Sequence, residues 1–302
     1  MSSRELIYPD TIIWNLLCDQ DVDPSKMIQS LSGRGFTFAI SFHTIYELAR
    51  NFERGDPPGI HRGRQLFAYL KRYLDHGTPC TKELWEMIIA VAYAMENHLP
   101  SIDPMATANQ CTIAKDEVEK LAQGTVEGRV KDFLEQRRRF AQDTKAQQEA
   151  HFIDRPELKA YLAAIPQDRV AEWMSRETFT AAGANLVYQT FIKNLGRGAS
   201  LEYIMDLLQF PLADATRATV RADLYSNWKC ARDGTNRLDL IDDVLHVLQA
   251  VHCGLYLTED KNQLQYSFLL LTPRTRVEIY PTRSTPIADW IVNVIQTNSS
   301  KL

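Results

Sequence analysis

The sequence predicts an α/β fold in which a parallel sheet flanked by helices is interrupted by a large all-helical insertion. Short apolar segments rich in β-branched and aromatic residues alternate with helical patterns at both ends of the 302-residue chain, which is typical of a parallel sheet. The long middle part has helical periodicity and almost no strand pattern. We therefore expect one α/β domain formed by residues 1–95 and 234–302, with residues 96–233 inserted as a helical segment.

The N-terminal part is expected to contain two strands, each followed by a helix. The glycines before the second strand and the Gly/Pro cluster after its helix mark turns. The predicted strands are Glu5–Asp10 and Phe36–Ser41. A first helix is expected to start with Thr11–Leu17, and two further helices are expected over Phe42–Phe52 and Ile60–Leu74.

The C-terminal part repeats this alternation, and the middle does not. Residues Leu238–Val251 have apolar side chains at helical spacing, and Gly254 ends that pattern. The predicted elements that follow are the strand Leu255–Thr258, the helix Asp260–Leu271 and the strand Arg276–Tyr280. In the middle, Lys115–Ala150 is rich in charged residues and Gln, as in a long solvated helix.

Composition restricts the function classes. The five cysteines contain no C-x-x-C pair, which argues against a disulfide framework and a structural zinc site. No apolar run approaches the length of a membrane span, and the N-terminus has no apolar signal segment, so we expect a cytoplasmic protein. The formal net charge of −4 does not favour a nucleic-acid binder, although an acidic site adds negative charge that bound metal offsets.

Four acidic residues occupy equivalent positions in the predicted fold. Asp10 ends the first strand, Glu47 lies in the helix after the second, and Asp260 follows the third. Ligands of parallel sheets bind at the carboxyl ends of the strands. Asp243 lies in the helix before the third strand and joins the others if that helix begins at the same edge. The pattern therefore predicts a shared carboxylate site.

Each of the four also has a purely structural explanation. Asp10 and Asp260 can cap helices, and Glu47 can complete a capping box opened by Thr44. Acidic residues near a helix start, such as Asp243, also favour the positive end of the helix dipole. Clustered carboxylates repel one another unless a cation is present. Oxygen-preferring ions such as Mg²⁺ or Mn²⁺ are the cations we expect here.

The four acidic positions stand in three longer motifs. The first two are the segment Y-P-Asp10-Thr11 and the strand and helix A-I-S-F-H-T-I-Y-Glu47-L. The third is the block Asp243-V-L-H-V-L-Q-Ala250-V-H-C-Gly254-L-Y-L-Thr258-E-Asp260. With these motifs the sequence resembles the PIN-domain ribonucleases. The match covers about the first ninety and the last seventy residues, and the middle of the chain has no counterpart in a minimal PIN domain.

The resemblance implies a compact PIN-like parallel sheet and metal-dependent cleavage of phosphodiester bonds, usually in RNA. Asp10, Glu47, Asp243 and Asp260 would be the catalytic carboxylates and the ligands of Mg²⁺ or Mn²⁺. Asp239 and Asp242 compete with Asp243 for the third position, and the spacing to Ala250 favours Asp243.

Further candidates surround these positions. Thr11, Asp242 and Thr258 could support the ligands from behind, although strand or cap roles explain the threonines equally well. His246 follows Asp243 on the same helix and could approach the metal. Basic residues that could contact nucleic acid, or simply form solvated helix faces, are Arg50, Arg54, Arg137, Arg138 and Arg139.

Three functions are compatible with these observations. The first is an Mg²⁺- or Mn²⁺-dependent endoribonuclease that acts on single-stranded RNA, as a toxin of a toxin–antitoxin pair or in RNA processing. Its helical insertion would then bind substrate, a protein partner or an antitoxin. The second is a non-catalytic PIN-like scaffold. The third is a helical protein-interaction module.

Overall fold

A computed structural model describes the fold for residues 4–137, 152–153, 155–187, 199–234, 238–261, 266, 275–281 and 285–299. Within these residues the elements are β1 (Glu5–Pro9), α1 (Thr11–Asp19), α2 (Pro24–Ser32), β2 (Phe36–Phe38), α3 (Phe42–Leu48), η1 (Ala49–Arg54), α4 (Pro57–Asp75), α5 (Leu84–Glu96), α6 (Ala108–Ala122), α8 (Pro156–Ala163), η2 (Gln167–Arg169), α9 (Val170–Glu177), α10 (Ala181–Val187), α11 (Leu201–Gln209), α12 (Asp214–Asp233), α13 (Leu238–Ala250), β3 (Leu255–Thr258), β4 (Arg276–Ile279) and α15 (Ile287–Ser299).

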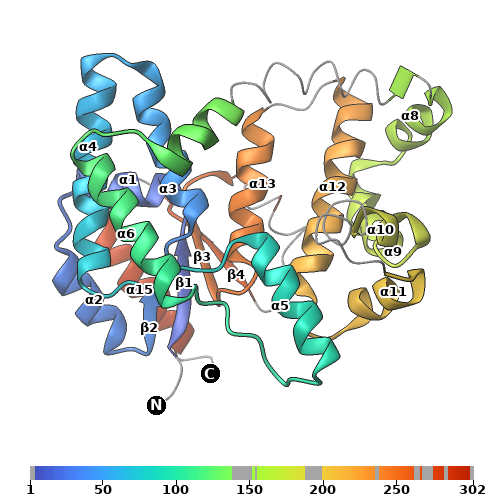
Figure 1. The fold of residues 1–302 in the computed structure, drawn as a ribbon, viewed down its shortest axis with the longest axis horizontal. Coiled ribbons are helices and arrows are strands. Elements are labelled where there is room, and N and C mark those ends of the chain that lie inside the picture. Colours follow the sequence, from blue (N-terminus) through green and yellow to red (C-terminus); the bar gives the residue numbers. More distant parts are fainter. Residues whose placement is uncertain are drawn as a thin grey trace.

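The described strands form one parallel sheet in the order β2-β1-β3-β4 (Figure 1). In this register Ile7 pairs with Phe38 on one side and with Leu255 on the other. Helices surround the sheet, as Figure 1 shows. The predicted α/β class with a parallel sheet flanked by helices is therefore confirmed.

The strand order creates a switch point beside β1. The chain leaves β1 toward β2 on one side, whereas β3 and β4 lie on its other side. The connections from β1 and toward β3 therefore diverge at the carboxyl ends of these two strands. In open parallel sheets this divergence leaves the crevice in which ligands bind. The sequence places Asp10 directly after β1 and Asp260 shortly after β3, at this crevice.

Both faces of the sheet are covered, as is usual for parallel sheets. Along β1, Leu6 and Tyr8 belong to one apolar core and Ile7 to the other, because side chains of a strand alternate between faces. The core around Ile7 contains residues of α1, α2, α3, α4, α6 and α15. The core around Tyr8 contains residues of α5 and of the helices from α8 to α13.

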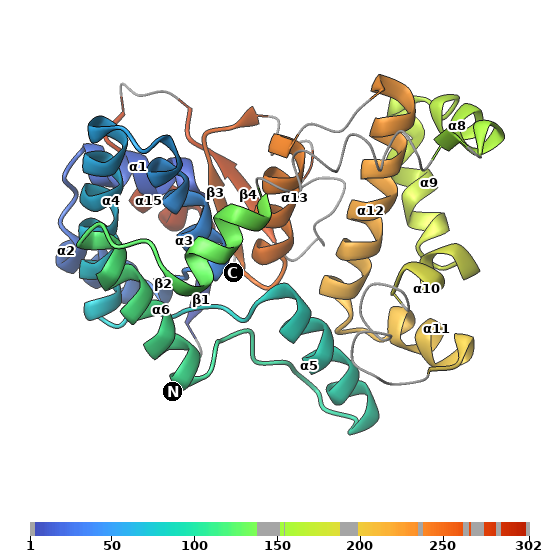
Figure 2. The same cartoon turned by 45° about the horizontal axis from the view of Figure 1, so that its top comes forward.

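The helices between α5 and α13 pack on both of these cores. α6 packs against α4, and its residues Ala114, Val118 and Leu121 are buried in the core around Ile7. The helices α8, α9 and α10 instead pack around α12, on the far side of α13 from the sheet (Figure 2). The predicted division of the chain at residues 95 and 233 stays a prediction, and the packing of α5 with α12 crosses the first of these boundaries.

Two predicted helices end earlier than expected. The helix predicted over Phe42–Phe52 is α-helical only to Leu48 and continues as the tighter 3-10 turn η1. The long solvated helix predicted over Lys115–Ala150 is wrong in its described part. α6 ends at Ala122, Gly124 adopts a left-handed conformation with φ 85°, and a new helical stretch covers residues 128–137. Apolar side chains on α6 are buried, so this helix is not solvated on all sides.

Other predicted elements agree more closely. The strands β1, β3 and β4 and the helix α13 are confirmed, while the second predicted strand pairs only over Phe36–Phe38. The sequence patterns missed α2 and α15. Most of the helix predicted over Asp260–Leu271 lies outside the described residues. Within the described part, no helix has both the length and the apolar character needed to cross a bilayer.

The segment η1 is held against α4 by a close contact between a glycine and an aromatic ring. A Cβ atom on Gly63 would approach the Phe52 ring to within 2.6 Å, and this ring stacks on Phe67 with a centroid distance of 6.0 Å. Gly63 thus lets η1 lie close to the helix that follows it. The segment begins at Ala49, two residues after Glu47.

We predict that Gly63→Ala lowers the free energy of unfolding by about 1–3 kcal/mol, because the added methyl group forces the Phe52 ring away. Helix propensity alone predicts the opposite, a gain of about 1 kcal/mol. Urea unfolding of wild type and variant measures the sign. In a Phe52→Leu background the loss should become smaller, and an equal loss in both backgrounds would contradict the proposed contact.

Candidate metal centre

Asp10 is fully buried at the start of α1, where it caps the helix. Its Oδ1 atom accepts a hydrogen bond from the backbone N–H of Ile13 at 2.9 Å. Its Oδ2 atom is also buried and makes no hydrogen bond in the structure. The structural explanation as a cap is therefore correct for one oxygen and leaves the other unexplained, since a buried carboxylate oxygen normally has a partner.

Burial is the main influence on the Asp10 carboxyl group and raises its pKa from 3.8 to about 6. The Thr258 hydroxyl, the Ile13 backbone N–H and the charge of His246 lower this pKa, while the charge of Glu47 raises it. The charges on Glu47 and His246 therefore influence the pKa of Asp10. A pKa shifted by burial and neighbouring charges in a crevice is typical of a functional site.

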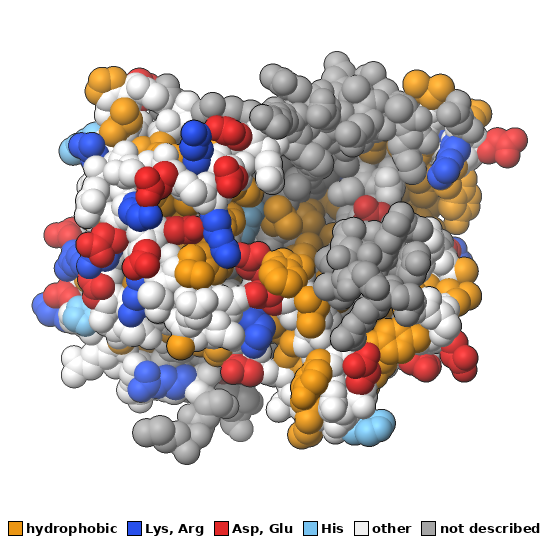
Figure 3. Space-filling model, viewed as in Figure 1, with side chains coloured by type: hydrophobic (Ala, Val, Ile, Leu, Met, Phe, Trp, Pro, Cys, Tyr) orange, Lys and Arg blue, Asp and Glu red, His pale blue; other side chains and the backbone are white. Residues whose placement is uncertain are grey.

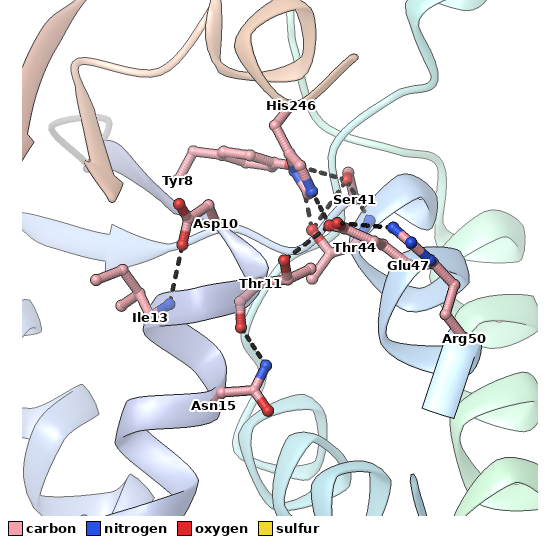
Figure 4. A network of polar contacts seen from close by, with 10 residues as sticks. All are labelled: Tyr8, Asp10, Thr11, Ile13, Asn15, Ser41, Thr44, Glu47, Arg50 and His246. Carbon is pink, nitrogen blue, oxygen red and sulfur yellow. Dashed lines mark hydrogen bonds and ion pairs between the residues drawn. The ribbon is translucent and has the colours of Figure 1, made fainter. Parts of the chain in front are cut away.

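Glu47 links α1, α3 and α13. Ser41, not Thr44, caps α3, so Glu47 is not part of a capping box. Its Oε2 atom accepts a 2.7 Å hydrogen bond from the Thr11 hydroxyl and contacts Nε2 of His246, as Figure 4 shows. Burial alone would raise the Glu47 pKa, but the charge and hydrogen bond of His246 outweigh it and lower this pKa to about 2. Glu47 is therefore anionic at neutral pH.

His246 is held in place on its other side by Tyr8. The Tyr8 hydroxyl lies 3.0 Å from Nδ1 of His246, 2.8 Å from the Ser41 hydroxyl and 3.1 Å from the Thr44 hydroxyl (Figure 4). Burial is the main cause of a raised pKa for Tyr8, which keeps this hydroxyl neutral. The ring of His246 is therefore fixed by hydrogen bonds at both nitrogen atoms.

Three side chains present ligand atoms within 4.8 Å of one another: His43, Glu47 and His246. Within the described part of the chain, these three side chains are close enough together to hold a metal ion. Two imidazoles and a carboxylate suit a divalent cation with affinity for both nitrogen and oxygen. Of the four predicted carboxylates, this group contains only Glu47.

The patterns singled out His246 but missed His43. His43 and Glu47 are spaced i, i+4 on α3, which places both on one helix face. This spacing was visible in the sequence. The ring of His43 meets that of His246 edge to face, with a centroid distance of 4.5 Å.

The remaining predicted carboxylates are not part of this group. Asp260 is half-buried, and its backbone N–H donates to the Thr258 hydroxyl at 3.0 Å. Thr258, the last residue of β3, also lowers the pKa of Asp10, which directly follows β1. Asp243 is half-buried on α13, in the second turn of the helix, and its charge acts on the buried Tyr256 hydroxyl.

A pocket of about 470 Å³ opens beside Glu47. This volume lies within the range of small-molecule sites, about 300–1,000 Å³. Polar side chains dominate its lining, which consists of Thr11, Asn15, Glu47, Leu48, Arg50, Asn51 and Glu53. Arg50 lies 3.6 Å from Oε1 of Glu47, so a cationic group borders both the pocket and the metal-binding group.

The other predicted basic residues are placed differently. Arg137 forms an ion pair with Glu53 at 3.6 Å and its side chain is only 14% exposed, which limits its access to a nucleic acid. The side chains of Arg54 and Asp242, together with Arg138 and Arg139, lie outside the described part of the structure.

We predict that Asp10→Asn stabilises the metal-free protein at neutral pH. The folded carboxyl group has the higher pKa, so its ionisation costs stability as pH rises from about 4 to about 6. The full cost corresponds to about 3 kcal/mol, and we expect Asn to recover about 1–3 kcal/mol of it. Asparagine also preserves the helix cap. Urea unfolding in the presence of a chelator measures the difference.

The pH dependence provides the control for this prediction. Below pH 4 the Asp10 carboxyl group is protonated in both folded and unfolded chains, so wild type and Asp10→Asn should converge in stability. A variant that is less stable at pH 7, or a difference that does not change with pH, would show that Asp10 is not a strained buried carboxylate.

No family model, curated protein or solved structure matches the chain. The resemblance to the PIN-domain ribonucleases therefore rests on the sequence motifs alone.

Proposed function

We propose that the chain is a metal-dependent nuclease that cleaves single-stranded RNA, with Asp10 and Glu47 at its catalytic centre. The observation that carries this proposal is the buried, hydrogen-bond-free Oδ2 of Asp10 at the switch point of the sheet, electrostatically coupled to the group of His43, Glu47 and His246. A carboxylate that lowers stability at a ligand-binding crevice is well explained by a cation that it helps to hold.

The chain's own residues would position the ion and the substrate. Glu47 would bind the ion, and the Thr11 hydroxyl donates a hydrogen bond that orients its carboxylate. Asp10 follows β1 at the same edge of the sheet, where the charges of Glu47 and His246 influence its pKa, and Asp260 and Asp243 would act through water. A bound divalent ion supplies Lewis acidity that activates water and neutralises charge on the phosphate. Arg50 borders the pocket in which a phosphate group would lie.

The resemblance to PIN-domain ribonucleases favours Mg²⁺ or Mn²⁺ as the ion, and the proposed reaction is hydrolysis within an RNA strand. Water adds to the phosphorus atom, one P–O ester bond breaks, and the leaving oxygen takes up a proton from the water, so that the products carry a phosphate group and a hydroxyl group. An endoribonuclease of this kind would fit a toxin–antitoxin pair or RNA processing, with a protein partner or antitoxin bound by the helical segment.

A non-catalytic scaffold or helical interaction module is the second candidate. Large apolar side chains are exposed on several helices, among them Trp85 and Tyr93 on α5, Tyr161 on α8 and Leu201 on α11. Figure 3 shows hydrophobic side chains over α5, whereas acidic and basic side chains are mixed over the neighbouring α4 and α6. Such exposed apolar groups favour protein partners.

We predict that Asp10→Asn and Glu47→Gln each reduce metal-dependent RNA cleavage by more than the ~10–100-fold loss typical of a residue that only supports a ligand. Both changes remove a negative charge and keep the side-chain shape. The assay uses a pool of end-labelled single-stranded RNA with Mg²⁺, Mn²⁺ or Zn²⁺. Asp75→Asn is the matched control, because Asp75 is exposed at the end of α4 and pairs with Lys71.

Cleavage activity that persists in both folded variants would show that Asp10 and Glu47 are not catalytic residues. A folded wild-type protein that leaves RNA and DNA intact with each of these ions would sink the nuclease proposal and make the scaffold the leading candidate.

We predict that Arg50→Ala weakens binding of single-stranded RNA and makes it less sensitive to salt. Loss of one phosphate contact should reduce the slope of log affinity against log salt by about 0.7. Arg50→Lys should retain most of the slope, since it keeps the charge. Arg34→Ala is the control, because Arg34 is exposed and contacts only Ser30 of α2 among the described bonds. Fluorescence anisotropy at several salt concentrations measures the slopes, and unchanged binding in Arg50→Ala would contradict this role.

A further inference from the structure

The donor atoms of the metal-binding group differ from those that Mg²⁺ selects. Mg²⁺ is bound by oxygen atoms and keeps several waters. Here two of the three ligands, His43 and His246, offer imidazole nitrogen. Imidazole suits zinc and its first-row neighbours, and two histidines with one glutamate are a known ligand set of catalytic zinc.

We propose that His43, Glu47 and His246 form a binding site for a first-row transition metal ion, with affinity in the order Zn²⁺, then Mn²⁺, then Mg²⁺. The claim that this ion serves the nuclease rests on the proposed function. The metal site itself is tested by binding measurements that need no RNA.

The ligands come from two helices that pack against each other. His43 and Glu47 lie one turn apart on α3, and His246 lies on α13. Ligand atoms at about 2.1 Å from a tetrahedral ion are about 3.4 Å apart. The three atoms now lie within 4.8 Å of one another, so small side-chain rotations close the site. An ion between Glu47 and His246 would take the place of the hydrogen bond that these two groups now make.

His246 has a hydrogen-bond partner at its second ring nitrogen, as metal-bound histidines usually have. With Nε2 bound to an ion, Nδ1 would carry the ring hydrogen and donate a hydrogen bond to the Tyr8 oxygen, 3.0 Å away. The Tyr8 hydroxyl in turn reaches the hydroxyls of Ser41 and Thr44. All of these side chains are buried. Partners of this kind fix the tautomer and the orientation of a metal-bound histidine.

One side of the group stays open. Glu47 and Thr11 line the pocket of about 470 Å³, so an ion held by the three side chains would be reachable from it. Three protein ligands with one open position are the arrangement of catalytic zinc, whereas structural sites are closed by four protein ligands. The geometry therefore points to an ion that can meet a substrate.

The test is metal binding by the full chain. Protein stripped with a chelator is titrated with Zn²⁺, Mn²⁺ and Mg²⁺ by calorimetry, and bound metal is counted by mass spectrometry after dialysis. We expect one Zn²⁺ per chain, weaker Mn²⁺ binding and the weakest binding for Mg²⁺. Mg²⁺ binding as tight as that of Zn²⁺ would overturn the proposal.

Variants locate the ion. His43→Gln and His246→Gln should each lose Zn²⁺ binding, while His61→Gln on the exposed face of α4 should bind as the wild type does. Tyr8→Phe keeps the ring packed and removes one hydroxyl, so it should weaken Zn²⁺ binding about 10–100-fold. Circular dichroism checks folding. If the histidine variants unfold, Tyr8→Phe decides, and full Zn²⁺ affinity in that folded variant would overturn the proposal.

The two proposals fail separately. Zn²⁺ bound at these residues without RNA cleavage supports the metal site and contradicts the nuclease. Mg²⁺-dependent cleavage that is unchanged in His43→Gln and His246→Gln, together with no loss of Zn²⁺ binding in these variants, supports a nuclease and overturns this metal site.

Discussion

The contact between Glu47 and His246 joins the two parts of the chain on which the candidate site depends. Glu47 follows β2 on α3, and His246 precedes β3 on α13. The contact is partly buried, which favours a proton or cation that balances the charge of the carboxylate. Thr11 holds the carboxylate and Tyr8 holds the imidazole, and both of these residues lie at or next to the end of β1. The central strand thus supports both halves of the pair.

The topology of the sheet explains why these residues meet. β1 lies between β2 and β3, and the connections diverge on its two sides. Side chains that follow β1, β2 and β3 therefore converge at one edge, although more than two hundred residues of sequence lie between the ends of β2 and β3. The described helices between them pack on both faces of the sheet.

The buried carboxylates also imply a balance between stability and function. Asp10 caps α1 through one oxygen, yet its burial raises its pKa and opposes folding at neutral pH. Glu47 has the opposite shift, because the positive charge of His246 more than offsets its burial. The pKa of Asp10 is therefore raised and that of Glu47 is lowered, although both lie at the same edge of the sheet. Shifts of this kind are common at functional sites.

The sequence by itself determined the α/β class, the strands β1, β3 and β4 and the helix α13, because these follow from local periodicity. It also singled out Asp10, Glu47 and Thr11 from their positions after strands, and the structure shows that Thr11 donates a hydrogen bond to Glu47. The functional roles of these residues stay a proposal. Only the tertiary structure brings His43 and His246 together with Glu47 in one group that can hold a metal ion. The packing of α5 was likewise decided by tertiary contacts, whereas α6 ends at a local feature, the left-handed Gly124. Metal ligands are chosen by distances across packed helices, and spacing along one chain does not contain those distances.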